Sequence, residues 1–364
     1  MLRSSDILRF YLPLVLTSQM MTLSGPIINV GIGRSADPTI EFAGYWLGFA
    51  VLLFLESPCL SVQQISATLI GNTPSIPRLI RVALSFGVLS TLLILTVALI
   101  DPVSAWIFRT VVPTTPRVAE VARTVLLLQS PIPLLLCLRG LANGFAIRQK
   151  RTDLVARATV VRLVTLSLGV GLFVAGASGS GAIAGAVALV TGIALETATV
   201  LWSVSRKART AWHQTTVGSP APYRFILRVA LPLVVAGTTW TALRPIINAA
   251  LGTLPDPERA QAGFGVVLPF VLATCSPLWI MHNVTLVLPR SVRDLRIVAR
   301  FAAGTSLFFA LLVLLVTWTG LRHWLLRDVF GLNDALAADV TPAIRIVAVE
   351  PFLLAGRGFA QGIL

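Results

Sequence analysis

Three carboxylic acids interrupt long apolar stretches of this sequence: Glu56, Glu196 and Glu350. A charge deep in apolar surroundings costs about 3 kcal/mol or more, so such a residue binds an ion, a substrate or another charged group. A carboxyl group in such a place can also take up and release a proton. Glu56 and Glu196 are therefore candidates for carrying a coupling proton. The alternative is an ion pair with an arginine on another helix, and Glu350, which precedes Pro351, fits that alternative.

Four arginines also lie within apolar stretches, and guanidinium groups are strong anion ligands. Arg244 precedes Pro245, where a helix break would free backbone carbonyls and make room for a ligand, so it is a substrate-binding candidate. Arg139 and Arg357 occupy equivalent positions in two related segments, and each either binds substrate or reaches the lipid headgroups. Arg162 is predicted to extend to the headgroups, because it lies about two helical turns from the end of its apolar stretch.

Amide side chains accompany two prolines at matching positions. Pro26, like Pro245, is expected to break its helix. Asn29 follows Pro26 by three residues, as Asn248 follows Pro245, and either asparagine could bind substrate or join helices by hydrogen bonds. A second set of polar residues favours a water-filled cavity. The histidine in this set has an alternative role, since a lone histidine is often a hydrogen-bonded core residue. This set comprises Gln63, Gln64, His282 and Asn283.

No residue pattern typical of catalysis, metal binding or ATP hydrolysis is found in the sequence. Cys59, Cys137 and Cys275 lie in apolar stretches, without a Cys-x-x-Cys motif or a neighbouring histidine. A nucleophile with a partner base and a Walker-type phosphate loop are also missing. We therefore expect a protein that is not an enzyme and that uses no metal or cofactor.

The elements that carry these residues are predicted to be membrane-spanning helices. Hydrophobic residues make up 55% of the chain and charged residues 12%, and about 20 apolar residues in a helix cross the hydrocarbon core. The apolar runs are too long for the strands of a membrane barrel. The ten predicted spans are 7–30, 41–70, 79–100, 122–147, 155–176, 181–204, 226–251, 261–289, 297–320 and 341–364.

The formal net charge of +14 is explained by membrane topology. Lysine and arginine cluster in alternate loops, around residues 78–81, 148–157, 206–228 and 290–300, whereas the loops between them are acidic or nearly neutral. Positive loops stay in the cytoplasm. The pattern predicts a cytoplasmic N-terminus and no nucleic-acid partner. The arginine-rich, lysine-poor composition indicates a bacterial inner membrane.

The sequence contains two copies of one unit. Residues 7–34 align without a gap on residues 226–253, an offset of 219, with 13 of 28 positions identical. The register slips by one further along, so that residues 139–144 meet residues 357–362. Six spans in the first copy imply two lobes of the same orientation, with substrate bound between them.

The predicted domains are an N-terminal lobe of six helices (1–206), a cytoplasmic linker (207–225) and a C-terminal lobe of four helices (226–364). The second copy ends where about 60 residues of the first have no counterpart, so the chain is expected to be truncated.

This arrangement resembles the multidrug/oligosaccharidyl-lipid/polysaccharide exporter superfamily, which includes multidrug-and-toxin-extrusion (MATE) pumps. Residues 8–13 (LRFYLP), 244–248 (RPIIN), 277–289 and 345–357 are similar to the progressive ankylosis protein branch. The resemblance implies a MATE-like fold of two parallel six-helix lobes and export of anions by alternating access. Two departures are the missing last two helices and Gly25, which stands where the second copy has Arg244.

The expected function is that of a secondary active exporter, an antiporter driven by H⁺ or Na⁺, with a small organic or phosphorylated anion as substrate. Arginines outnumber glutamates among the buried candidates, which favours an anion. Three alternatives remain open. They are efflux of cationic drugs, flipping of a lipid-linked oligosaccharide, and an inactive truncated protein or scaffold.

Overall fold

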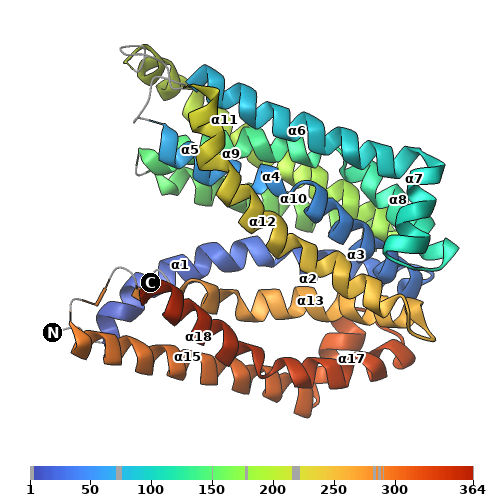
Figure 1. The fold of residues 1–364 in the computed structure, drawn as a ribbon. Helices are drawn as coiled ribbons and strands as arrows, with labels where there is room; N and C mark the ends of the chain where they lie inside the picture. Colours follow the sequence, from blue (N-terminus) through green and yellow to red (C-terminus); the bar gives the residue numbers. More distant parts are fainter. Residues whose placement is uncertain are drawn as a thin grey trace. The chain divides into compact units, whose positions relative to one another are not determined.

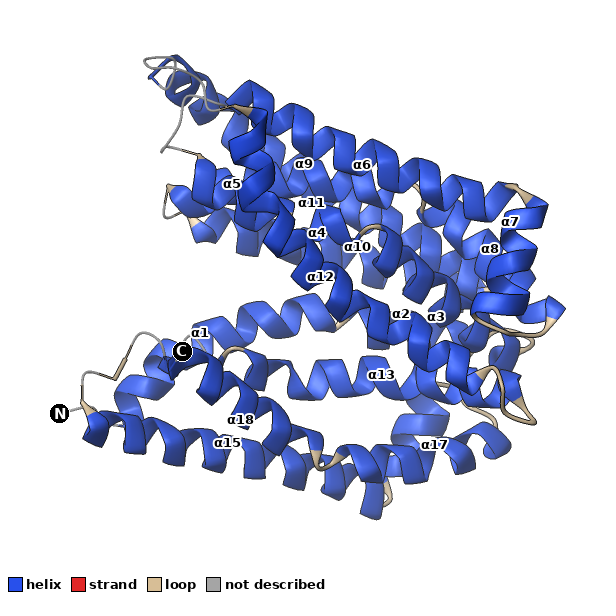
Figure 2. Ribbon diagram, in the orientation of Figure 1, coloured by secondary structure: helices blue, strands red, loops and turns tan. Residues whose placement is uncertain are grey.

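The computed structural model describes residues 4–70, 76–149, 151–176, 179–214, 222–281, 284–285, 288–289 and 291–363. This part of the chain is helical throughout and contains no β-strand (Figure 2). The protein is an all-α polytopic membrane protein, as predicted. His282 and Asn283 lie outside the described residues.

The helices run in chain order as follows (Figure 1). Those of the first copy are α1 (Ser4–Thr22), α2 (Ser24–Ile32), α3 (Pro38–Leu55), α4 (Ser57–Leu60), α5 (Val62–Leu69), α6 (Ile76–Leu99), α7 (Asp101–Trp106), the π-helix η1 (Ile107–Val111), α8 (Pro116–Gln129), α9 (Ile132–Arg148), α10 (Thr152–Gly176) and α11 (Gly181–Gln214). Those of the second copy are α12 (Tyr223–Leu251), α13 (Pro257–Trp279), α15 (Val292–Trp318), α16 (Leu321–His323), the π-helix η2 (Trp324–Val329), α17 (Asp334–Val347) and α18 (Glu350–Ile363).

Fewer continuous spans are present than the ten predicted. Seven helices of the described chain are long and apolar enough to cross a membrane, and the bent pair α8 and α9 makes an eighth, with 41° between its halves. The predicted spans 7–30 and 341–364 are each divided into two shorter helices, α1 with α2 and α17 with α18. The predicted span 41–70 consists of α3, α4 and α5.

Prolines account for these interruptions except the one between α4 and α5. At each of four breaks the following helix has a proline within its first three residues, where the missing N–H is not needed by the helix. These prolines are Pro26 in α2, Pro58 in α4, Pro133 in α9 and Pro351 in α18. The break expected at Pro245 is not present, because α12 continues through this residue. A proline inside a long helix removes one hydrogen bond and bends the helix without ending it.

The repeat is confirmed by the helix bounds. The start of α3 at Pro38 and that of α13 at Pro257 differ by 219 residues, as do the ends of α6 at Leu99 and α15 at Trp318. After the predicted slip of one residue, α8 and α17 correspond at an offset of 218, since Pro116 matches Asp334. Both copies also contain a short π-helix at the same place, η1 and η2.

The helices pack into two compact units that do not follow the two copies of the repeat. The first unit comprises Met1–Arg34 and Gly263–Leu364, and the second comprises Ser35–Ala262. In the first unit, α15 packs against α1, α17 and α18 (Figure 1). In the second, α3 packs against α8, α10 against α11, and α12 against α3 and α4. The first helix of each copy is thus grouped with helices of the other copy. The lobe boundaries expected from the repeat stay a prediction.

Equivalent glycines follow the C-terminal ends of α2 and α12 and allow close packing there. A Cβ at Gly33 would overlap the carbonyl oxygen of Phe330 in the first unit, and a Cβ at Gly252 would overlap the carbonyl oxygen of Pro113 in the second. Gly33 and Gly252 are 219 residues apart, at the repeat offset. Both contacts join backbone to backbone, so a side chain could be accommodated only if the loop moved away.

Gly252→Ala is expected to destabilise the protein by about 1–3 kcal/mol, since overpacking forces the backbone to shift. Gly304→Ala is the matched control, because Gly304 lies in α15 with no atom within 4 Å of the added Cβ. Thermal unfolding of the detergent-solubilised protein measures both. The packing role of Gly252 would be refuted if its melting temperature stayed at or above that of the control.

A buried charge cluster as the candidate functional site

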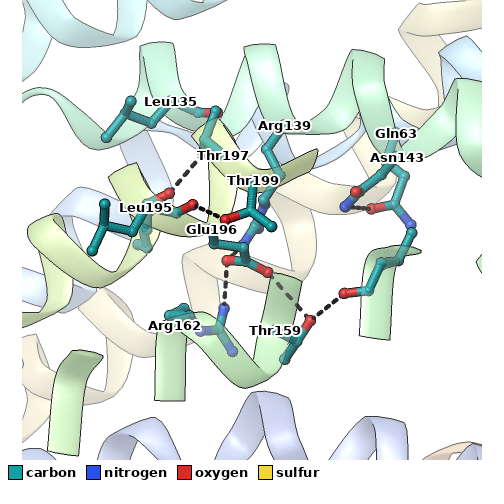
Figure 3. A network of polar contacts seen from close by, with 12 residues as sticks. Gln63, Leu135, Arg139, Asn143, Thr159, Arg162, Leu195, Glu196, Thr197 and Thr199 are labelled. Atoms are coloured by element: carbon teal, nitrogen blue, oxygen red, sulfur yellow. Dashed lines mark hydrogen bonds and ion pairs between the residues drawn. The ribbon is translucent and has the colours of Figure 1, made fainter. Parts of the chain in front are cut away.

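Glu196 on α11 is the centre of a polar network in the second unit (Figure 3). Its Oε2 lies 2.6 Å from Nη1 of Arg139 on α9 and 3.4 Å from Nη1 of Arg162 on α10. Thr159, one turn before Arg162, donates from Oγ1 to the other carboxylate oxygen at 3.3 Å. One carboxylate therefore ties together three helices, and the structure shows the ion pair that the sequence left as an alternative for Glu196.

All three charged side chains of this network are withdrawn from the surface. The exposed fraction of the side chain is 13% for Arg139, 3% for Glu196 and 7% for Arg162. The prediction that Arg162 extends to the headgroups is therefore wrong. An opposite charge on the neighbouring helix stabilises its guanidinium group inside the protein, because each charge offsets the desolvation of the other.

Small residues let α10 and α11 approach closely enough for this contact. A Cβ at Gly192 would lie 3.2 Å from Cγ of Arg162, and a Cβ at Gly169 would lie 2.9 Å from Cβ of Ala188. Larger side chains at these glycines would push the helices apart. Small residues at helix interfaces are a common means of close packing in membranes.

Glu56 occupies the break between α3 and α4, with φ −89° and ψ 0°. The residue is 2% exposed, and its Oε2 has no hydrogen-bond partner in the described part of the chain. The guanidinium groups of Arg139 and Arg244 are its positively charged neighbours, yet neither forms an ion pair with it within 4.0 Å. Glu56 is therefore a buried carboxyl group in an arginine-rich setting without a direct ion pair.

Arg244 is half-buried on α12, next to Pro245. Its carbonyl oxygen accepts a hydrogen bond from Nδ2 of Asn248 at 3.0 Å, and the carbonyl oxygen of Asn248 accepts one from Nε2 of Gln261 at 3.2 Å. Ser57 on α4 and Thr238 on α12 share a hydrogen bond of 2.8 Å. The Ser57–Thr238 hydrogen bond holds α12 beside the break that carries Glu56. The side chain of Asn248 thus bonds the backbone of its own helix, and its role in binding or packing stays a prediction.

The cluster carries more positive than negative charge. It contains the two carboxyl groups of Glu56 and Glu196. It also contains three guanidinium groups, those of Arg139, Arg162 and Arg244. With both carboxyl groups ionised one positive charge remains, and a protonated Glu56 leaves two. A buried site with excess positive charge attracts an anion, because charge interactions weaken little in surroundings of low dielectric constant.

The amide side chains of Asn143 on α9 and Gln63 on α5 extend this polar region. Nδ2 of Asn143 donates to Oε1 of Gln63 at 3.1 Å (Figure 3), and the buried Oδ1 of Asn143 has no partner among the described residues. Asn143 is not among the candidates predicted from the sequence. Its position four residues after Arg139 places both side chains on one face of α9, and this spacing could have identified it.

The remaining candidates are not part of the cluster. Gln64 is exposed on α5, and Asn29 is fully buried on α2 of the first unit. Glu350 begins α18, where it is partly buried with Cys275 as a neighbour, and Arg357 is exposed on the same helix. Within the described residues, no group of three histidine, cysteine, aspartate or glutamate side chains could hold a metal ion.

Comparison with known proteins was informative at the level of structure. No family model and no curated protein matches the sequence. An inward-facing multidrug resistance MATE family transporter of the MOP superfamily matches with a TM-score of 0.71 and 17% identity, over 95% of this chain and 81% of that one. A eukaryotic MATE transporter matches with a TM-score of 0.63 and 13% identity, over 99% of this chain and 82% of that one.

A MOP superfamily transporter from Pyrococcus furiosus matches with a TM-score of 0.53 and 17% identity, over 98% of this chain and 82% of that one. Identities this low show a common fold and no more, and the progressive ankylosis resemblance stays a prediction. The chain therefore has the fold of the MATE family transporters of the MOP superfamily.

Proposed function

We propose that this protein is a secondary active exporter of a small organic or phosphorylated anion, working by alternating access between the lobes 1–206 and 226–364. The observation that carries the proposal is the excess of guanidinium groups over carboxyl groups around the buried Glu56 and Glu196. The fold supports transport, because its solved members are transporters. The protein lies in a lipid bilayer. This bilayer is proposed to be a bacterial inner membrane, with the N-terminus on its cytoplasmic side.

Within this proposal the arginines have different roles. Arg139 and Arg162 hold Glu196 and thereby fix three helices. Arg244 has no such ion pair in the described structure and is the group proposed to bind the anion. Glu56 is proposed to bind the coupling ion, H⁺ or Na⁺. A cation at Glu56 adds one positive charge to the cluster and should strengthen anion binding by Arg244.

Efflux of a cationic drug is the second candidate, and the carboxylate oxygen of Glu56 that lacks a hydrogen-bond partner favours it. A single buried carboxylate can bind either a cationic substrate or a proton, so the two ligands would compete. The Pyrococcus furiosus neighbour is described by a reverse polarity of its binding pocket that suggests a different function.

Flux measurements on the purified protein in liposomes separate these candidates. Labelled citrate, pyrophosphate and ATP are compared with a cationic dye under imposed proton and sodium gradients. The proposal predicts anion flux above that of protein-free liposomes, and dependence on one of the two gradients identifies the coupling ion. Dye flux without anion flux would replace the proposal by multidrug efflux, and absence of any flux would contradict both.

A further inference from the structure

Equivalent cavities occur in the two copies, beside the π-helices. The cavity of about 440 Å³ in the first copy is lined by residues of α7, η1 and α8. The cavity of about 400 Å³ in the second copy is lined by residues of α16, η2 and α17. Arg109 of the first corresponds to Arg327 of the second at an offset of 218. The two sites are thus two versions of one structural feature.

The charges that line the two cavities differ. In the first cavity Arg109 and Arg123 are balanced by Asp101 and Glu120, and Arg123 pairs with Asp101 at 2.7 Å. The second cavity has one acidic and four basic or titratable lining residues. These are Asp334 against Arg322, His323, Arg327 and Arg345.

Asp334 supplies the one carboxylate in the lining of the second cavity, and it forms an ion pair of 2.9 Å with Arg327. The charges of Arg322 and Arg345 are therefore not balanced by any acidic residue in its lining. The Nε of Arg345 is buried and has no hydrogen-bond partner in the described part of the chain. In the first copy the position of Arg345 is held by Leu127, 218 residues earlier. The second cavity is suited to an anion, and the first is not.

An apolar groove adjoins the second cavity. It has a volume of about 490 Å³ and runs along the end of α15, where Phe308, Leu311, Leu315 and Trp318 line it. The guanidinium group of Arg345 stacks on the ring of Trp318, 4.5 Å from its centre. One residue pair therefore joins the basic cavity to the apolar groove.

The position of this pair matches the membrane interface. Trp318 ends the apolar helix α15 and is 69% exposed, and Trp324 begins η2 and is 56% exposed. Exposed tryptophans at helix ends are typical of the headgroup region of a bilayer. Arginine side chains at this depth reach the phosphates of the adjacent leaflet, with their aliphatic part against apolar groups.

We propose that the basic cavity between α16, η2 and α17 binds the phosphate of an anionic phospholipid, with an acyl chain in the apolar groove of α15. Arg322 and Arg345 bind the phosphate, and the ring of Trp318 separates headgroup from chain. Charge complementarity and the adjoining apolar groove favour a lipid over a soluble anion. The neutral cavity of the first copy binds no such lipid. This inference does not depend on the transported substrate.

Lipid retention measured by native mass spectrometry tests this proposal. The protein is purified in detergent, and mixed phosphatidylglycerol and phosphatidylcholine are added. We expect one phosphatidylglycerol to bind preferentially, and the double variant Arg322→Gln/Arg345→Gln to weaken its binding about 25-fold, at about fivefold for each arginine. The matched control is Arg109→Gln/Arg123→Gln in the first cavity, which should retain the lipid as the unmodified protein does.

The other outcomes would overturn the proposal. Equal lipid loss in both double variants would show a general charge effect, and unchanged retention in Arg322→Gln/Arg345→Gln would place the lipid elsewhere. Inorganic phosphate that displaced the lipid at comparable concentration would indicate a site for free anions. Thermal unfolding in phosphatidylcholine alone verifies that the variants are folded. If the double variant is not folded, the single variant Arg322→Gln, at a half-buried position, provides the test with an expected fivefold loss.

Discussion

Glu196→Gln is expected to destabilise the protein by about 3–5 kcal/mol, because it leaves the guanidinium groups of Arg139 and Arg162 buried without a negative charge. Glutamine can still accept a hydrogen bond, but it cannot offset the desolvation of two cations. The 2.6 Å contact to Arg139 and the 3.4 Å contact to Arg162 would both lose their charge component. Thermal unfolding of the solubilised protein, followed by circular dichroism, measures the loss.

The control for this prediction makes the same change at an exposed position. Glu120→Gln on α8 should alter stability by no more than about 0.5 kcal/mol, as surface substitutions generally do. Replacing all three charged residues by apolar ones, Arg139→Met/Arg162→Met/Glu196→Leu, should regain much of the stability, since no buried charge is then left unpaired. Equal stability of Glu196→Gln and Glu120→Gln would contradict the structural role of the ion pair.

Glu56→Gln is expected to abolish the dependence of anion flux on the coupling gradient. A neutral amide resembles the protonated carboxyl group, so the cluster keeps its higher positive charge at every pH. Anion flux should persist under a substrate gradient alone, with a KM that no longer varies with pH. A cationic dye, by contrast, would lose its binding partner. Flux into liposomes at several pH values, with and without a proton or sodium gradient, measures the effect.

Glu120→Gln again serves as the control and should keep the gradient dependence of the unmodified protein. Anion flux through Glu56→Gln that still followed the gradient would remove Glu56 from the coupling step. Loss of all anion flux, with unfolding behaviour unchanged, would assign Glu56 a role in substrate binding instead.

Much of the helical architecture could be predicted from the sequence, because apolar runs of about 20 residues have few other stable structures in a membrane. The repeat offset of 219 and its slip to 218 reappear in the helix bounds. The break at Pro26 is predicted from the sequence, whereas those at Pro58 and Pro133 are not, since these prolines lie within apolar runs that hydropathy cannot divide. Pro245 shows the reverse error, because α12 continues through it.

The identity of the site residues could be predicted better than the contacts between them. Glu56, Arg139, Glu196 and Arg244 were recognised as buried ionisable residues, and the structure places all four in one unit. The sequence does not show which helices are neighbours, so Arg162 was expected at the headgroups although α11 places Glu196 beside it. For the same reason the repeat shows which helices are equivalent, whereas the packing of α1 and α12 depends on tertiary contacts.

The most direct test of the anion-exporter proposal is the efflux of labelled anion through Arg244→Gln, compared with Arg228→Gln on the exposed surface of the same helix. A guanidinium group that binds the substrate contributes about 1.5–3 kcal/mol through charged hydrogen bonds, so Arg244→Gln should raise the KM for the anion about 10- to 100-fold. Arg228→Gln should leave it unchanged. An unchanged KM in Arg244→Gln, with the protein folded and active, would contradict the proposal that this buried arginine cluster binds the transported anion.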